Sequence, residues 1–224
     1  MKSFLCVAFA CLLSSLSLQA NPMVTVQEVS ISPFETTHIK VMTPDNSSVF
    51  YDGNVLAGIN NLLVDGVATT GFCIDPFHFS IGGPVIGYEV VDLTEAPKGA
   101  NMDAQQAATI RALWTLNFDA IGNSNTAAAA LQIAIWEVVA GSRFSLPAGQ
   151  SDFGAADLVS DAENYHGATV NLVALTGSGQ DYVIPGSVPD AGTTSLLLAI
   201  GIGVLLLVQR IYPLPRYAVA NRRG

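Results

Sequence analysis

The hydrophobic and polar positions divide the chain into a β-rich first half, a helical middle part and a short return to strand. Six strands are predicted in the first half, because β-branched and aromatic residues recur in short runs that turn residues separate: 24–31, 38–42, 49–51, 55–64, 67–74 and 86–91. Asp52-Gly53 and Asp65-Gly66 are the predicted tight turns, since such pairs tolerate the positive φ angles of hairpins. An antiparallel meander follows from this pattern.

The spacing of apolar residues changes to a helical period after residue 100. Asn101 and Asp103 are predicted to cap a first helix that ends at Gly122, and a second helix is predicted at 127–140. The second segment reads AAAALQIAIWEVVA and is apolar nearly all round, which is typical of a helix that is packed on several sides.

A third, more polar helix is predicted at 155–165, and strands follow at 169–175 and 182–184. Strands surrounding a block of helices indicate an α+β class. We therefore expect an antiparallel β barrel or sandwich with an inserted helical subdomain.

The N-terminal segment 1–20 has the layout of a secretory signal peptide. Lys2 precedes an apolar run at 4–13, and small polar residues lead to Ala20 as the expected cleavage position for a signal peptidase. The alternative, a buried N-terminal helix, is disfavoured because nothing polar interrupts the run.

The C-terminal segment carries the second long apolar run, 195–208, which 191–194 extend without a charge. Its length approaches the ~20 residues that cross a bilayer. Arg210, Arg216, Arg222 and Arg223 follow it and fit a cytoplasmic flank. We expect a transmembrane sorting helix within 188–224, a linker at 181–187, and one domain at 21–180.

Charge is partitioned as sharply as hydrophobicity. All 18 acidic residues lie between Glu28 and Asp190, where the chain has 4 basic residues, so this part has a net charge of −14. An acidic surface repels nucleic-acid backbones and anionic lipid, which argues against nucleic acid as a partner.

Cys73 is the one cysteine that remains after removal of the signal peptide, because Cys6 and Cys11 lie within it. A single thiol in an oxidising compartment is expected to be buried, paired with another chain or chemically committed. Gln132 is the second unusual polar residue, since it lies inside the apolar second helix. Attack of the thiol on its carboxamide, with loss of ammonia, would give an internal thioester. An inert buried Cys and a hydrogen-bonded Gln are the alternative.

The Phe-Cys-Ile-Asp stretch at Cys73 and the later apolar-Gln-x-Ala-Ile-Trp stretch at Gln132 resemble the motifs of thioester domains of bacterial surface proteins. The resemblance covers about residues 45–180. It implies a barrel or sandwich with a helical insertion, with Cys73 as the sulfur donor and Gln132 as the acyl donor. It also implies that Phe72, Leu131 and Trp136 shield the bond from water, with Leu131 at a position where threonine is frequent.

The tail has a resemblance of its own. Val188, Pro189, Asp190, Ala191 and Gly192, followed by the apolar run and the arginines, resemble the VPDSG variant of PEP-CTERM sorting signals, with Ala191 in the place of serine. The resemblance implies processing by an exosortase-type enzyme. It also implies a protein that crosses the inner membrane, is transiently anchored there, and ends at the cell surface or in the extracellular matrix.

Three functions are consistent with these features. The first is a covalent adhesin whose thioester reacts with an amine on a surface target or in an exopolysaccharide matrix. The second is a non-reactive structural coat or matrix protein that an exosortase processes. The third is a Cys–His protease or transpeptidase built on Cys73 and His78, although their spacing fits no known pair. We expect no enzyme.

No cofactor or metal is expected either, because His38, His78 and His166 lack the paired spacing of metal ligands.

Overall fold

The computed structural model describes residues 21–43, 45–80 and 82–186. The expected signal peptide, the sorting motif at 188–192 and the expected transmembrane helix lie outside these residues. Within the described ranges, no helix is both long and apolar enough to cross a membrane.

Seven strands form one antiparallel sheet in the order β2-β3-β7-β6-β4-β1-β5 in the described part of the chain. β1 also pairs with β2, at the other end of this order. The six strands β2, β3, β7, β6, β4 and β1 therefore form a closed ring of hydrogen-bonded neighbours, and β5 lies outside the ring. The strands are β1 (Met23–Met42), β2 (Val49–Val64), β3 (Val67–Cys73), β4 (Val85–Val91), β5 (Phe144–Ser145), β6 (Leu172–Thr176) and β7 (Tyr182–Pro185).

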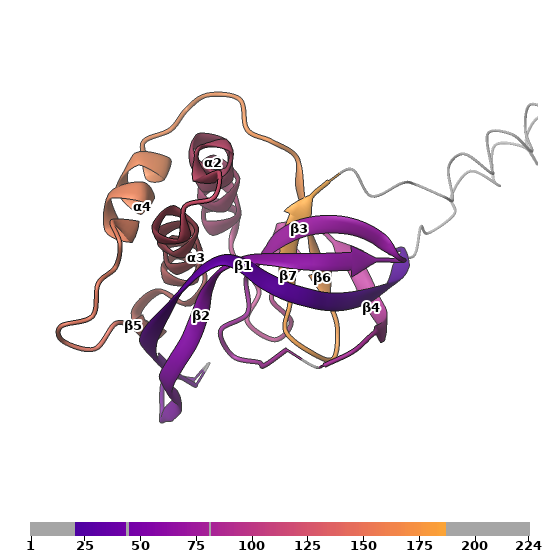
Figure 1. Ribbon diagram of the computed structural model, residues 1–224, viewed down its shortest axis with the longest axis horizontal. Coiled ribbons are helices and arrows are strands. Elements are labelled where there is room, and N and C mark those ends of the chain that lie inside the picture. The colour runs from indigo at the N-terminus through magenta and orange to yellow at the C-terminus, as the bar shows by residue number, and fades with distance from the viewer. Residues whose placement is uncertain (1–20, 44, 81, 187–224) are drawn as a thin grey trace, which may run out of the picture. The chain divides into compact units, whose positions relative to one another are not determined.

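The helices are inserted between β4 and β6 and lie together on one side of the strands (Figure 1). They are α2 (Ala104–Ile121), α3 (Asn125–Ala140) and α4 (Ala155–Glu163), with short 3₁₀ turns η1 (Leu93–Glu95) and η2 (Gly141–Arg143). The expected mixed class, with an antiparallel sheet and inserted helices, is confirmed.

Helix α3 is the centre of this packing. It contacts α2, α4, β1, β2 and β3, and buried residues lie on all its sides. Ser124 caps its N-terminus by accepting a hydrogen bond from the backbone N–H of Ala127, and its C-terminus ends at Gly141. The all-round apolar sequence therefore predicted the environment of this helix correctly, although the helix begins two residues before the expected start.

Two predicted strand breaks are wrong. β1 continues through 32–37, where a register shift against β2 between Ile31 and Phe34 accommodates Pro33 within the strand. β2 continues through Asp52-Gly53, which form no turn because they pair with Lys40 and Ile39 of β1. The Asp65-Gly66 turn is confirmed, and both residues have a positive φ angle.

The strand predicted at 182–184 is present as β7, which pairs with both β3 and β6. It lies within the stretch 181–187 that the domain division had assigned to a linker. Its residues Tyr182, Val183 and Ile184 are buried. The apolar run predicted the strand itself, whereas its central place between β3 and β6 depends on non-local partners that the local sequence does not reveal.

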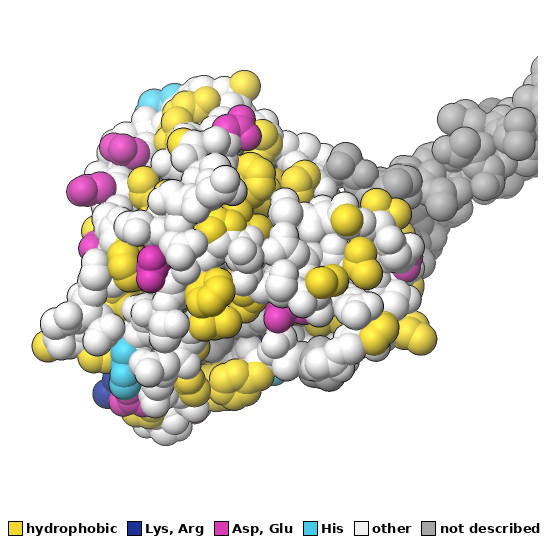
Figure 2. Space-filling model, viewed as in Figure 1, with side chains coloured by type: hydrophobic (Ala, Val, Ile, Leu, Met, Phe, Trp, Pro, Cys, Tyr) yellow, Lys and Arg dark blue, Asp and Glu magenta, His cyan; other side chains and the backbone are white. Residues whose placement is uncertain are grey.

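Acidic side chains are dispersed over the face of the molecule shown in Figure 2, and basic side chains are rare there. Arg111 pairs with Asp92 at 2.7 Å. On this face, the acidic side chains expected from the sequence are thus dispersed and not gathered into one patch.

Candidate functional site

Cys73 is the last residue of β3, at the point where the strand meets the helices. It pairs with Tyr182 of β7, and the following residue, Ile74, donates its backbone N–H to the carbonyl of Asp181 at 3.0 Å. Pro76 then prevents further strand pairing. The strand end therefore places the Cys73 thiol on a rigid element, with 2 % of the residue exposed.

Gln132 lies on the α3 surface that faces this strand end. The Cys73 backbone N–H donates to Gln132 Oε1 at 3.0 Å, and Gln132 Nε2 donates to the Cys73 carbonyl at 2.8 Å. The side chain is 1 % exposed. The structure thus brings together the two residues that the sequence singled out, and the carboxamide is held against the Cys73 backbone by two hydrogen bonds.

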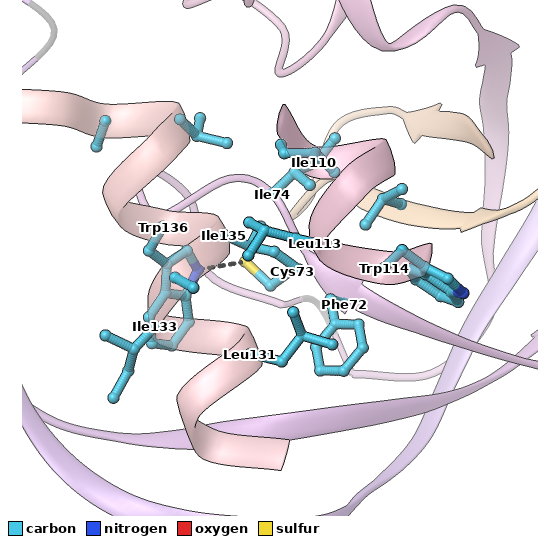
Figure 3. Close-up of a cluster of buried hydrophobic side chains, with 14 of the residues drawn as sticks. Phe72, Cys73, Ile74, Ile110, Leu113, Trp114, Leu131, Ile133, Ile135 and Trp136 are labelled. Carbon is cyan, nitrogen blue, oxygen red and sulfur yellow. Dashed lines mark hydrogen bonds between the residues drawn. The ribbon is translucent and has the colours of Figure 1, made fainter. Parts of the chain in front are cut away.

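The Cys73 sulfur accepts two hydrogen bonds of its own. Trp136 Nε1–H donates to Sγ at 3.3 Å, as the dashed line in Figure 3 shows, and the Asp75 backbone N–H donates at 3.3 Å. Trp136 lies one helical turn after Gln132 on α3. The same helix therefore presents the carboxamide and an N–H donor to the same cysteine.

The expected shielding residues are all buried. Phe72, Leu131 and Trp136 belong to the main core cluster, and Figure 3 shows them gathered around Cys73. The Phe72 ring makes an edge contact with Trp114, with ring centroids 5.6 Å apart. The site is therefore surrounded by tightly packed apolar side chains on the helical side.

Burial raises the pKa of the Cys73 thiol far above its ordinary value, and the negative charges of Asp75 and Asp181 act in the same direction. The hydrogen bonds from Trp136 and the Asp75 backbone lower the pKa only in part. The uncharged thiol is accordingly the stable form. This environment is the opposite of the one that activates a catalytic cysteine, whose pKa is lowered.

His78 is bonded to a carboxylate instead of the thiol. Its Nδ1 lies 2.6 Å from Asp75 Oδ2, and the other oxygen of Asp75 accepts the Phe77 backbone N–H at 3.0 Å. Burial raises the pKa of Asp75 above its ordinary value, and the neighbouring His78 offsets this increase only in part. Among the described residues, the donors to Cys73 Sγ are Trp136 and Asp75, so this geometry does not form a thiol–imidazole pair.

Asp181 is a buried acid that sequence reasoning missed. Its carboxylate accepts the backbone N–H groups of Lys98 at 2.7 Å and Gly177 at 3.0 Å, and it thereby fixes the loop beside Ile74. Burial raises its pKa to about 6. The only available signal was an acidic residue directly before the apolar run 182–184, which is weak because linkers are also acidic.

A pocket of about 340 Å³ opens onto the site. Cys73, Gln132 and Trp136 form part of its lining, and because they are almost fully buried they lie at its floor. Its other lining residues come from β1, from β2 and from the segments that follow β3 and precede β7: Glu28, Ile31, Ile39, Tyr51, Asn54, Val55, Leu56, Asn60, Pro76, His78, Phe79, Ser80 and Gln180. The pocket therefore adjoins the Cys73 and Gln132 side chains.

No group of three or more His, Cys, Asp or Glu side chains suited to a metal ion occurs within 21–43, 45–80 and 82–186. The histidines lie apart, with His38 beside Asp52 and His78 beside Asp75.

Comparison with known proteins gives two similarities. The profile of the VPDSG-CTERM motif matches residues 187–212, so the tail carries the sorting motif that its sequence predicted. The fold is similar to the N-terminal thioester domain of a surface protein from Clostridium perfringens, with a TM-score of 0.37 and 11% identity over 67% of this chain and 98% of that one. No curated protein matches the chain.

Proposed function

We propose that this chain is an exported surface protein in which Cys73 and Gln132 join in an internal thioester for covalent attachment to an amine. The observation that carries the proposal is the pair of hydrogen bonds between the Cys73 backbone and the Gln132 carboxamide, at 3.0 and 2.8 Å, at the floor of a pocket. The VPDSG-CTERM motif at 187–212 supports export and processing by an exosortase-type enzyme.

The bond would form by attack of the Cys73 sulfur on Cδ of Gln132. The C–N bond breaks, the thiol proton leaves with the amide nitrogen, and one ammonia is released. Because burial disfavours the charged thiolate, an uncharged covalent product suits this environment better than an ionised cysteine. The closed ring of strand pairing is, in this proposal, the barrel that the thioester-domain resemblance implies.

The same hydrogen bonds would assist opening by a nucleophile. When an amine adds to Cδ, negative charge develops on Gln132 Oε1, to which the Cys73 backbone N–H already points. The departing sulfur would be stabilised by Trp136 Nε1–H and by the Asp75 backbone N–H. The amine loses a proton, the sulfur gains one, and an amide links the partner to Gln132. Each molecule reacts once, so this chemistry is attachment and not turnover.

A non-reactive coat or matrix protein is the second candidate, and one observation favours it. Both polar atoms of the Gln132 carboxamide are already bonded to the Cys73 backbone, so the buried amide is satisfied without any covalent bond. The VPDSG-CTERM motif supports export equally in this case.

Methylamine labelling distinguishes the two candidates. A thioester predicts that methylamine adds to Gln132 and exposes one titratable thiol at Cys73, and that Cys73→Ala abolishes the labelling. The matched control is Gln106→Ala, which changes a carboxamide on the neighbouring helix whose Nε2 bonds the Val138 carbonyl, and labelling should persist in it. Absence of labelling in the wild-type protein would leave the non-reactive candidate.

A further inference from the structure

One buried polar atom of a pocket-lining residue has no partner. Asn60 is 2 % exposed, and its Oδ1 makes no hydrogen bond within the described part of the chain. Its neighbour Asn61 differs, because Asn61 Nδ2 donates to Ser30 Oγ and to the Ser32 carbonyl, both at 3.2 Å. Buried acceptors are paired in the large majority of cases, so an unpartnered one on a pocket-lining residue points to a partner that enters through the pocket.

The strand register explains why Asn60 lacks a partner. Asn60 of β2 lies opposite Gly71 of β3, which has no side chain to offer. A Cβ at position 71 would lie 2.5 Å from the Val183 carbonyl oxygen, so the close approach of β7 requires glycine there. The strand position opposite Asn60 therefore carries no polar side chain, and the apolar side chains of Ile184 and Leu62 lie beside it.

The same register places Asn60 near the reactive centre. Cys73 is two residues after Gly71, and residues two apart in a strand share a face. Asn60 and Cys73 are thus diagonal neighbours on one face of the β2–β3 pair, a relationship with a typical separation of about 7–8 Å. Both line the pocket together with Gln132. Asn60 and the Gln132 carboxamide therefore border the same pocket.

We propose that Asn60 positions the attacking amine: its Oδ1 accepts a hydrogen bond from one N–H of the amine while the nitrogen lone pair adds to Cδ of Gln132. The inference rests on the proposed thioester and adds a residue that selects the nucleophile. Asn60 takes no proton. The Cδ–N bond forms, the Cδ–Sγ bond breaks, and the proton lost by the amine is balanced by the one gained by Cys73.

Two nucleophiles of similar size separate this role from a structural one. Methylamine carries N–H donors on its attacking atom, whereas methanethiolate carries none. Removal of the Asn60 acceptor should therefore slow attack by methylamine and leave exchange with methanethiolate unchanged. A general disturbance of the pocket would change both rates together.

The experiment uses the processed protein purified from its host and follows both reactions by intact-mass spectrometry. In Asn60→Leu, the methylamine rate should fall roughly tenfold or more, the loss expected for one buried hydrogen bond, while the methanethiolate rate stays within about twofold of wild type. Asn60→Asp retains an acceptor oxygen and should retain the methylamine rate. Asn60→Ala replaces the leucine variant, with the same expectation, if leucine prevents folding.

Thr37→Val is the matched control. Among the described residues, Thr37 Oγ1 is the other buried side-chain N or O atom without a hydrogen-bond partner. Thr37 is not among the pocket-lining residues, so the rates with methylamine and with methanethiolate should both persist. Equal loss of both rates in Asn60→Leu, unchanged methylamine attack, or a Leu variant that never forms the thioester would each overturn the role of Asn60. Wild-type protein at its full sequence mass would overturn the thioester and this inference together.

Discussion

Cys73 and Gln132 are 59 residues apart in the chain, yet each donates a hydrogen bond to the other, at 3.0 Å from the Cys73 backbone and at 2.8 Å from the Gln132 side chain. The contact joins the end of β3 to the middle of α3. It holds the carboxamide beside a thiol that is buried, uncharged and hydrogen-bonded by Trp136.

Phe72→Ala is expected to destabilise the domain strongly. The ring is fully buried and contacts Trp114 and Phe118 edge-on, so its removal leaves a cavity beside Cys73 and should lower the free energy of unfolding by about 3–5 kcal/mol. Chemical denaturation measures the change. The control is Phe79→Ala, a ring that is 60 % exposed, for which about 1 kcal/mol or less is expected. Similar losses in both variants would contradict the assignment of Phe72 to the core.

Asp181 should make the stability depend on pH. Its pKa is about 6 in the folded protein because of burial, above the ~4 of an unfolded chain. The folded state therefore holds the proton of Asp181 more tightly than the unfolded chain does. The stabilisation that this proton provides is complete below about pH 4 and is lost as the pH rises to about 6. The loss is on the order of 2–3 kcal/mol. Burial also raises the pKa of the neighbouring Asp75, so this carboxyl likewise lowers the stability of the fold as the pH rises.

Asp181→Asn tests this relationship through the slope of the unfolding free energy between pH 4 and 6. The slope should become shallower, even if the lost hydrogen bond lowers stability at every pH. Asp119→Asn removes an exposed carboxylate and should leave the slope as in wild type. An unchanged slope in Asp181→Asn would show that this carboxyl is not the group that titrates.

The sorting motif should control processing in the native host. Replacement of Val188, Pro189 and Asp190 by alanine is expected to leave unprocessed precursor in the inner membrane, because these residues begin the matched VPDSG-CTERM segment. Fractionation followed by mass measurement of the C-terminus provides the test. Pro213→Ala, outside the matched residues 187–212, is the control and should be processed normally. An equal yield of mature protein in the triple variant would favour a simple membrane anchor.

Much of the fold could be predicted from local sequence patterns. The period change after residue 100, the Asp103 cap and the all-round apolar sequence of α3 predicted helices that the structure contains. The two long strands could not be predicted in full, because Pro33 and Asp52-Gly53 are local breakers. The extended pairing of β1 with β2 overrides these local preferences.

Some residues of the candidate site could likewise be identified from the sequence, and others could not. Cys73 and Gln132 could be identified because each is a polar residue in an apolar run. Asn60 and Asp181 could not, since their significance depends on non-local geometry: Asn60 lies opposite Gly71, which offers no polar side chain, and Asp181 is surrounded by the backbone N–H groups of Lys98 and Gly177. A sequence pattern reveals an unusual residue but not a missing partner.

The mass of the intact, processed protein tests the central proposal most directly. Joining Cys73 to Gln132 expels ammonia and nothing else, so the wild-type protein should be lighter than its sequence mass by one ammonia. Cys73→Ala and Gln132→Ala should each have the full mass of their sequences. Wild-type protein at full mass, with Cys73 alkylated after unfolding without prior amine treatment, would contradict the thioester.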